Sequence, residues 1–465
     1  MSALHEECGV FGIWSPHAAP VAHTVYYGLY ALQHRGQESC GIVVCRDGQF
    51  TSHKDLGLVH EVFPPETMAA FPDATMAVGH VRYSTTGGLT RANCQPIEVF
   101  HRGQPMALAH NGNLSNGAAL RRALENDGAI FHTPSDTEVI AYLFTRARMT
   151  SASLAEAVQQ TMAQLDGAYS LLFLCADCLI AVRDPHGFRP LCIGRTADGA
   201  RIVASESCAL QAVGAVPERD IAPGEIVLLD DSGVRSIQTP VAPRTPCIFE
   251  YIYFARPDSV IDGVSVHGAR LRAGALLAQA HPADADVVIG VPDSGLDAAL
   301  GYANASGIPY GIGFTKNKYI GRTFIEPTPG ERVNLVQIKL NPIRETVAGK
   351  RVVLVDDSLV RGTTSRQIVR LLRDAGATEI HLRVSAPPFR NPCYYGTDID
   401  SREHLIACRY TVPEIAARIG ADSLGYLPAE ALAQLIGSPD YCAACFTGAY
   451  PTAVEDSGGL DLDNR

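Results

Sequence analysis

The sequence lacks long apolar runs, a secretory signal and an excess of positive charge. No stretch approaches the ~20 apolar residues needed to cross a bilayer. The first seven residues have neither the basic start nor the apolar stretch of an export signal. The 38 Lys and Arg are outnumbered by 49 Asp and Glu, and the resulting formal net charge of -11 argues against nucleic acid as the main partner. These absences predict a cytoplasmic protein with no role in a membrane.

Tryptophan is nearly absent as well, with one residue in 465, and the cysteines do not indicate a disulfide framework. Thirteen cysteines is an odd number, and no export signal accompanies them. They therefore point to free thiols, a nucleophile or metal ligands. A composition of 46% hydrophobic and 19% charged residues is typical of a globular protein. At roughly 100 to 200 residues per domain, the length predicts two domains or a little more.

The two halves of the chain differ in pattern. Between residues 8 and 229, short strand-like runs such as 170–175 alternate with Gly and Asn turns, which predicts a layered α+β domain. A Pro-rich polar stretch at 235–245 is the expected linker. Beyond it, uniform aliphatic runs at 287–291 and 352–355 each precede an acid-bearing loop and a helical pattern. These runs predict an α/β domain with a parallel sheet, whose ligands bind at the carboxyl ends of the strands.

The most informative stretch is residues 352–365, where an apolar run delivers two acids and then a loop of small hydroxylated residues. The run predicts a buried strand, and the spacing of apolar residues after it predicts a helix that begins near Thr363. The free amides of a helix start suit a phosphate monoester, and Gly362 lets the backbone come close. Asp356 and Asp357 could hold the hydroxyls of a ribose, or a magnesium ion beside them.

Two further segments belong to the same half. Residues 291–295 form a second loop of small residues after a predicted strand, and their backbone amides could cradle pyrophosphate. Residues 316–324 combine basic side chains with flanking glycine. A solvated basic surface is one interpretation of that stretch, and a lid over an anionic ligand is the other.

The segment 352–365 resembles the phosphoribosyl pyrophosphate (PRPP) motif of type I phosphoribosyltransferases. This resemblance implies that Ser294, Asp356 and Asp357 contact one magnesium ion per subunit. It also implies that the basic stretch closes over PRPP, offsets the charge of the leaving pyrophosphate and excludes water. The residues implied to bind PRPP are Asp356, Asp357, Ser358, Arg361, Gly362, Thr363, Thr364, Lys316, Lys318, Tyr319 and Arg322.

The first half carries a possible nucleophile. Cys8 opens a strand-like alternation, where a lone cysteine is normally a core residue. It is followed in order by the blocks Gln-His-Arg-Gly-Gln-Glu-Ser at 33–39, Gly-His-Val-Arg-Tyr-Ser-Thr at 79–85, His-Asn-Gly-Asn at 110–113 and Ser-Asp-Thr-Glu at 135–138. Together these blocks are similar to the class II glutamine amidotransferases, which use an N-terminal nucleophile and a layered αββα fold.

Amide hydrolysis requires a thiolate, a base and donors for the oxyanion that forms. If residues 1–7 are a propeptide and are removed, Cys8 gains a free α-amine whose pKa of about 7.7 to 8.0 suits the role of base. The resemblance implies that Asn111 and Gly112 supply the oxyanion hole.

The same resemblance implies how glutamine is held. Arg82 would pair with its α-carboxylate, which the guanidinium fork matches, although a surface salt bridge is the alternative for an arginine taken alone. Asp136 would hold the α-ammonium group. Arg35 would be a supporting charge near the nucleophile. We assign no catalytic role to the histidines of these blocks.

Four cysteines of the second half form a further pattern. Cys442 and Cys445 make a CxxC, which alone fits zinc, an iron–sulfur cluster or a redox pair. Cys247 and Cys393 each follow a proline. The four resemble the ligands of one branch of the glutamine phosphoribosylpyrophosphate amidotransferases, which carries one [4Fe-4S] cluster per subunit and a short propeptide. Four thiolates suit zinc equally well, and only the resemblance favours iron.

The other cysteines are expected to be core or incidental thiols. Cys175 and Cys178 fall in or near strands, where alternation places them on opposite faces.

The resemblance to this family spans nearly the whole chain. It implies a propeptide at 1–7, a glutaminase domain at 8–234 and a phosphoribosyltransferase domain at 246–452. The acidic composition of residues 453–465 predicts a disordered tail. The implied enzyme is a pentosyltransferase that passes ammonia from glutamine to PRPP through an apolar passage. The products would be 5-phosphoribosylamine, pyrophosphate and glutamate, in the first committed step of purine synthesis.

Further expectations concern partners. Purine nucleotides are expected to inhibit, since a nucleoside monophosphate shares the ribose 5-phosphate group with PRPP. The family also implies a homo-oligomer, either a dimer or a tetramer. The alternative function is a regulatory protein that senses PRPP on the same fold.

Overall fold

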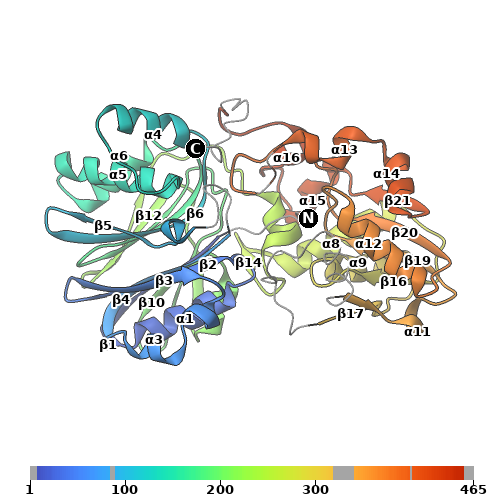
Figure 1. Cartoon of the computed structure of the whole chain (residues 1–465), viewed down its shortest axis with the longest axis horizontal. Helices are drawn as coiled ribbons and strands as arrows, with labels where there is room; N and C mark the ends of the chain where they lie inside the picture. Colours follow the sequence, from blue (N-terminus) through green and yellow to red (C-terminus); the bar gives the residue numbers. More distant parts are fainter. Residues whose placement is uncertain (1–7, 84–89, 318–339, 398, 400, 455–465) are drawn as a thin grey trace.

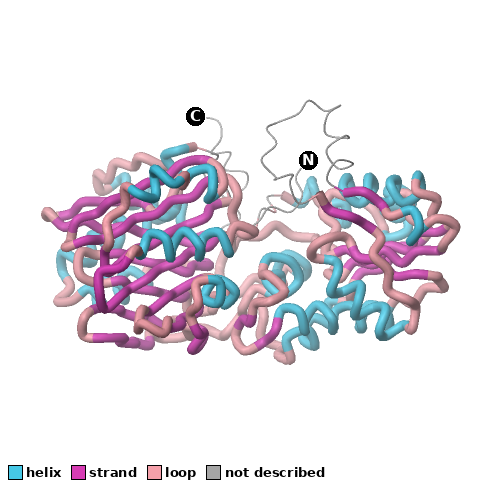
Figure 2. Tube along the Cα trace, turned by 90° about the horizontal axis from the view of Figure 1, so that it is seen from below, coloured by secondary structure: helices cyan, strands magenta, loops and turns pink. Residues whose placement is uncertain are grey.

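The computed structural model describes residues 8–83, 90–317, 340–397, 399 and 401–454. The chain forms two lobes, one built from the first half of the sequence and one from the second (Figure 1). Strands dominate the first lobe, whereas the second alternates strands and helices, as the tube in Figure 2 shows. No helix in these described ranges is long and apolar enough to cross a membrane.

The first lobe contains two antiparallel sheets packed face to face. The strands of one are, in sheet order, β11 (Val216–Asp220), β9 (Cys192–Arg195), β10 (Arg201–Ala204), β1 (Gly9–Ala19), β4 (Ala74–Arg82), β2 (Ser39–Arg46) and β3 (Gln49–Leu56). The strands of the other are β13 (Gly233–Gln238), β12 (Glu225–Asp230), β8 (Leu179–Arg183), β7 (Gly167–Leu174), β6 (Gln104–Leu114) and β5 (Ile97–His101).

Helices cover the outer faces of both sheets and complete the predicted αββα layers. The helices α1 (Val21–Ala31) and α7 (Ser207–Ala212) lie on the first sheet, and α4 (Gly117–Asn126), α5 (Asp136–Thr150) and α6 (Leu154–Met162) lie on the second. Side-chain alternation explains the layers. In β1, Val10 faces the other sheet and Phe11 faces the helices; in β7, Leu172 and Phe173 divide in the same way. Both faces of these strands are therefore buried.

Two details of this lobe differ from the sequence-based expectations. β13 pairs with β12 up to Gln238, so the sheet extends into the expected linker 235–245. The expectation that Cys175 and Cys178 face opposite sides is wrong, because both side chains lie in one apolar core. They close the β7–β8 hairpin, where the amide of Cys175 donates to the carbonyl of Cys178 at 2.9 Å. Residues directly opposite each other across a hairpin share a face.

The second lobe is built on a parallel sheet, as predicted. Its strands are, in sheet order, β16 (Val287–Gly290), β19 (Arg351–Asp356), β20 (Glu379–Val384) and β21 (Ser423–Tyr426). The main helices are α8 (Val266–Ala280), α9 (Gly295–Ser306), α12 (Thr363–Asp374) and α14 (Val412–Ile419). α12 begins at the predicted residue, and its buried face carries Ile368, Val369 and Leu372.

Shorter elements complete the described part of the chain. In the first lobe they are α2 (Val59–Val62), α3 (Pro65–Ala69) and the 3-10 turn Arg91–Asn93. In the second they are the π-helix Glu250–Phe254, β14 (Val260–Ile261), β15 (Val264–Ser265), β17 (Phe314–Lys316), β18 (Leu340–Pro342), α11 (Arg344–Val347), the 3-10 turns Arg402–His404 and Ala429–Ala431, α13 (Ile406–Arg409), α15 (Leu432–Ile436) and α16 (Ala444–Thr447).

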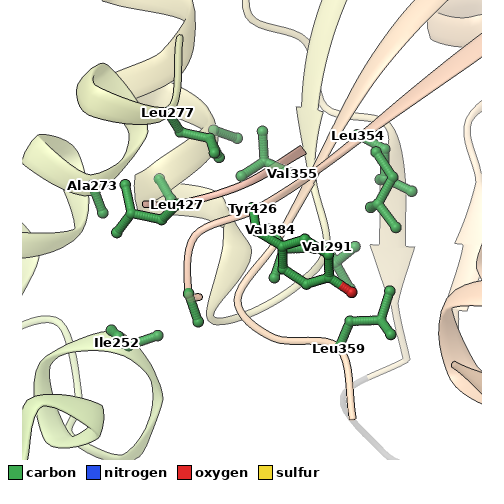
Figure 3. Close-up of a cluster of buried hydrophobic side chains, with 14 of the residues drawn as sticks. Ile252, Ala273, Leu277, Val291, Leu354, Val355, Leu359, Val384, Tyr426 and Leu427 are labelled. Atoms are coloured by element: carbon green, nitrogen blue, oxygen red, sulfur yellow. The ribbon is translucent and has the colours of Figure 1, made fainter. Parts of the chain in front are cut away.

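A dense apolar core supports the carboxyl ends of the parallel strands. Figure 3 shows Leu277 of α8 near Val355 of β19, with Val291 and Leu359 from the loops that follow β16 and β19. The loops at this sheet edge are thus anchored by buried side chains. Such anchoring keeps the polar residues between them in fixed positions.

Candidate active sites

The first site lies where β1 begins and β4 ends. Cys8 directly precedes β1, and the pairing of Gly9 with Val81 brings it beside Arg82. Cys8 and Arg82 are both buried, at 7% and 4% exposure. The Cys8 thiol donates to the carbonyl of Tyr83 at 3.6 Å. The structure thus places the predicted nucleophile and the predicted carboxylate partner at one end of the same sheet.

The facing sheet contributes Asn111 and Gly112 from β6. In the described part of the chain, neither the amide nitrogen nor the oxygen of the buried Asn111 side chain has a hydrogen-bond partner. Gly112 has φ of 141°, and a Cβ there would lie 2.1 Å from the carbonyl oxygen of Ala168. Unpaired buried polar atoms are costly, and they are common where a ligand supplies the missing bond. The pair therefore fits an oxyanion hole.

Asp136, the first residue of α5, is held at the same end of the second sheet. Its carboxylate accepts from the amide of Leu114 at 3.0 Å and lies 3.5 Å from Nδ1 of His110. Burial acts to raise the pKa of Asp136, but His110 and the amides of Leu114 and Thr137 outweigh it and hold the pKa below its usual value. The carboxylate stays charged, as the binding of an ammonium group requires.

Histidines connect the two sheets behind these residues. Nε2 of His80, in β4, lies 2.9 Å from the carbonyl oxygen of His110, in β6. His110 also contacts the hydroxyl of Thr137 at 3.2 Å. Burial lowers the pKa of His80 to about 3, so its imidazole is neutral. The chain of contacts positions Asp136 relative to β4, a role that the sequence blocks alone did not reveal.

Arg35 connects this site to the second lobe. Its Nε donates to the carbonyl of Cys8 at 3.0 Å, and its other nitrogens reach Glu206 at 2.7 Å and Glu250 at 2.7 and 2.9 Å. All three charged side chains are buried. Burial acts to raise the pKa of Glu206, but His34 and Arg35 hold it well below its usual value. We call Arg35, Glu206 and Glu250 the buried ion network.

The sequence blocks contained Arg35 but neither acid of the network. Glu250 stands in the otherwise apolar run Ile248 to Phe254, and a single acid in such a run is a detectable signal of a buried charge. Glu206 lies just before α7 in a polar context, so no comparable signal marks it.

The second site lies at the carboxyl ends of β16 and β19, which are adjacent and parallel. Asp356 and Asp357 are both buried. The hydroxyls of Ser294 and Ser358 donate to Asp357. The structure therefore brings together Ser294, Asp356 and Asp357, the predicted magnesium contacts.

The charges of this acid pair are poorly compensated. Burial raises the pKa of Asp356 well above its usual value, and the neighbouring Asp357 carboxylate adds to the effect. Burial also raises the pKa of Asp357, against the lowering effects of Ser294, Ser358 and Arg270. Arg270, on α8, was not predicted from the sequence. A divalent cation is the partner that such an oxygen set favours, so the residues fit magnesium.

The hydroxyl loop forms the turn between β19 and α12. Gly362 caps the helix with φ of 78°, a conformation that glycine adopts without strain. Arg361 and Thr364 are half-buried, and Thr363 is exposed at the first turn of the helix. The turn leaves the first amides of α12 available to an anion.

The predicted lid is described only at its start. Lys316 ends β17, and its ammonium contacts the carboxylate of Asp293 in the loop after β16. The predicted PRPP contacts Lys318, Tyr319 and Arg322 lie outside the described residues.

The four cysteines of the second half lie close together. Cys247 pairs with Cys442 through a backbone bridge, and the Cys442 amide donates to the carbonyl of Pro246 at 2.8 Å. Burial raises the pKa of Cys445, and the thiols of Cys393, Cys247 and Cys442 add to the effect in that order. The other three thiols therefore lie near Cys445.

The four thiols have the chemistry of metal ligands, but their positions are not those of a formed metal site. The amide of Tyr395 donates to Cys393 Sγ at 3.4 Å, as amides do around thiolate ligands. Burial raises the pKa of Cys442 to about 12, and a bound metal would deprotonate it. Among the residues that the structure describes, no group of three or more His, Cys, Asp or Glu side chains has the arrangement of a metal site. All thirteen cysteines lie in the described ranges, and none of them is in a disulfide there.

Comparison with known proteins decides the family. A glutamine amidotransferase domain model matches residues 80–212, and a phosphoribosyl transferase domain model matches residues 267–417. The amidophosphoribosyltransferase of Methanocaldococcus jannaschii is 50% identical over 464 residues, covering 96% of this chain and 98% of the relative. The chain belongs to the amidophosphoribosyltransferase family.

Other members of the family agree. The amidophosphoribosyltransferase of Bacillus subtilis is 48% identical over 98% of this chain and 96% of its own length. The solved structure of the glutamine PRPP amidotransferase from B. subtilis, in complex with ADP and GMP, superposes with a TM-score of 0.90 at 47% identity. It covers 97% of this chain and 98% of that one. The two-domain fold is thus that of the family.

Proposed function

We propose that this chain is an amidophosphoribosyltransferase, EC 2.4.2.14, which hydrolyses glutamine at Cys8 and transfers the ammonia to PRPP. The products are glutamate, pyrophosphate and 5-phosphoribosylamine, in the first step of purine biosynthesis. One observation carries the proposal: a buried cysteine at the start of β1, a buried asparagine with unpaired amide atoms in β6 and a serine–aspartate pair at a parallel sheet edge occur in one chain.

The glutaminase step uses the first lobe. With residues 1–7 removed, the α-amine of Cys8 takes the thiol proton, and the thiolate attacks the side-chain amide of glutamine. Asn111 Nδ2 and the amide of Gly112 donate to the oxyanion. Arg82 and Asp136 hold the α-carboxylate and the α-ammonium group. Arg35 supports Cys8 through its carbonyl rather than through glutamine, since its guanidinium is bonded to two carboxylates.

The transfer step uses the second lobe. The turn 358–364 holds the 5-phosphate of PRPP, and Asp356 and Asp357 face its ribose. Bound magnesium, held by Ser294, Asp356 and Asp357, would neutralise charge on the pyrophosphate. Lys316, with Lys318, Tyr319 and Arg322, closes over the sugar, and ammonia then displaces pyrophosphate at the anomeric carbon. An apolar passage between the lobes keeps the ammonia unprotonated.

Cys247, Cys393, Cys442 and Cys445 would hold a [4Fe-4S] cluster. The cluster would support the structure by joining three segments that are far apart in the sequence. Cys393 stands one residue before Tyr394, whose carbonyl accepts from the Asn113 side chain at 2.9 Å, so the cluster would brace the chain beside Gly112.

Regulation and assembly follow the family. The B. subtilis structure contains ADP and GMP, which supports purine nucleotides as inhibitors of this chain. A homo-oligomer, dimer or tetramer, and a cytoplasmic location remain predictions from the sequence.

The deciding experiment measures pyrophosphate release from PRPP, with either glutamine or ammonium as nitrogen donor, in anaerobically purified parent and Cys8→Ala. We expect the parent to use both donors and the variant to use ammonium only. A folded, processed parent without PRPP-dependent turnover would favour the PRPP-sensing alternative. Intact mass provides a second check, because active enzyme that retains Met1 would contradict the removal of residues 1–7.

A further inference from the structure

A cavity of about 190 Å³ lies beside the start of α12, between that helix, α13 and α14. Its lining is strongly basic, with four arginines and one histidine: Arg361, Arg366, Arg409, Arg418 and His404. Two buried side chains, Ile406 and Ile419, also line it. No carboxylate is among the lining residues. Figure 1 shows α12, α13 and α14 grouped in the second lobe, in orange and red.

Three of the arginines around the cavity have no carboxylate partner in the part of the chain that the structure describes. Within the described ranges, Arg361, Arg366 and Arg409 make no ion pair with a carboxylate, and the buried Nε of Arg361 has no hydrogen-bond partner. Arg418 lies near Glu414, but that acid already accepts bonds from Thr411 at 2.8 Å. The cluster is therefore a concentrated positive field, which attracts anions.

Tyr410 holds two of these arginines in place. The guanidinium of Arg418 lies 3.6 Å from the centre of the Tyr410 ring, and that of Arg409 lies 5.5 Å from it. Stacking on an aromatic ring attracts a guanidinium while leaving its N–H groups free to bond elsewhere. The arginines are thus preorganised without being neutralised. Arginine forks match the oxygens of phosphate groups.

The volume limits the ligand. Sites for drug-sized molecules occupy roughly 300 to 1,000 Å³, so a cavity of about 190 Å³ is too small for a whole nucleotide. It has room for a small oxyanion.

We propose that this cavity is a second anion site, which binds a free phosphate-type oxyanion of the size of pyrophosphate separately from the PRPP site. Arg366, Arg409, Arg418 and His404 lie outside the PRPP-binding residues assigned above. The site shares only Arg361, Gly362 and Thr363 with the phosphate turn. The proposal rests on the proposed function only in treating the cavity as distinct from the PRPP site.

The test uses calorimetric titration of the full chain with inorganic pyrophosphate, in a chelated, magnesium-free and phosphate-free buffer. The double variant Arg409→Gln, Arg418→Gln should bind pyrophosphate at least tenfold more weakly than the parent. Arg370→Gln is the matched control, because Arg370 is an exposed arginine of α12 outside the cavity. It should bind like the parent. Equal affinity in the double variant and the parent would overturn the proposal.

A second measurement separates this site from the PRPP site. The KM for PRPP of the double variant should stay within twofold of the parent, and a tenfold rise would make the cavity part of the PRPP site and overturn the proposal. The size argument would be contradicted if adenosine 5′-monophosphate bound the parent more tightly than pyrophosphate does and if this binding were lost in the double variant. The binding is measured without turnover, so its failure is distinct from a failure of the amidotransferase reaction.

Discussion

At the scale of single residues, the blocks of the first half identified side chains that the structure brings together, but not the groups that hold them. Cys8, Arg82 and Asn111 were visible because they stand in blocks that resemble those of the class II glutamine amidotransferases. Glu250 carries a local signal of a buried charge, but the identity of its partner Arg35, 215 positions away, could not be inferred from that signal. Contacts of that range depend on the tertiary fold, which local patterns do not encode.

Asn111 gives a direct test of the oxyanion hole. Asn111→Ala removes the side-chain donor, and we expect a loss of about 10²- to 10³-fold in kcat with glutamine. Turnover with ammonium should stay close to that of the parent, because the transfer site is untouched. Steady-state kinetics with the two donors provide the measurement. An equal loss with both donors would indicate misfolding or a different role.

His80 predicts an acid-dependent loss of stability. Its pKa is about 3 in the folded state and about 6.5 in an unfolded chain, so below pH 6.5 protons bind the unfolded state preferentially. Stability is therefore lost as pH falls, by up to ~1.4 kcal/mol per pH unit.

The variant His80→Gln keeps a donor for the His110 carbonyl but takes up no proton. We expect its Tm to fall less than that of the parent between pH 6.5 and 4.5, as followed by circular dichroism. His17→Gln changes an exposed histidine and should behave like the parent. A parallel fall in His80→Gln would contradict the assignment.

At the scale of elements, uniform aliphatic runs predicted β16 and β19 well, because strands buried on both faces have few other interpretations. The start of α12 followed from the helical spacing of the apolar residues after the hydroxyl turn. The end of β13 was missed, since its outward face is polar and resembles a linker. The hairpin of Cys175 and Cys178 was missed because alternation within strands does not describe the turn between them.

The π-helix Glu250–Phe254 carries a testable connection between the lobes. Glu250→Gln removes one charge from the buried ion network and leaves Arg35 partly uncompensated. We expect at least a tenfold loss of glutamine-dependent turnover, with a smaller loss when ammonium is the donor.

The matched control is Glu225→Gln, which changes a buried acid of β12 that is paired with Arg219 and lies outside the buried ion network. It should leave the ratio of glutamine to ammonium activity unchanged. A Glu250→Gln enzyme with an unchanged ratio would show that the network has only a structural role.

At the scale of the whole molecule, two domains were expected from length and from the change of pattern, and the family match covers 96 to 98% of the chain. The arrangement of the lobes was beyond the sequence, since it depends on buried contacts such as the stacked rings of Phe188 and Tyr395, 4.4 Å apart. Cys393 lies two positions before Tyr395, so the cysteine group sits beside this junction.

The cysteine group predicts a metal content. Anaerobic protein should contain about four iron and four sulfide per chain, and Cys442→Ser should lower both together with the Tm. Elemental analysis and absorption spectra give the measurement. One zinc per chain without sulfide would replace the cluster with structural zinc. Cys408→Ser, at an exposed thiol, is the control and should retain full metal content.

The buried ion network has a consequence for how such a protein can change over time or be re-engineered. A buried guanidinium from one half pairs with a buried carboxylate from the other, so separating the halves at residues 239–247 would expose an unpaired charge on each. If the first half were replaced by a glutaminase domain from another lineage, Glu250 would be left buried without a partner unless the new domain had an arginine at the position of Arg35. The two halves are therefore expected to evolve together. A substitution of Arg35 or Glu250 requires a compensating substitution of its partner in the other half.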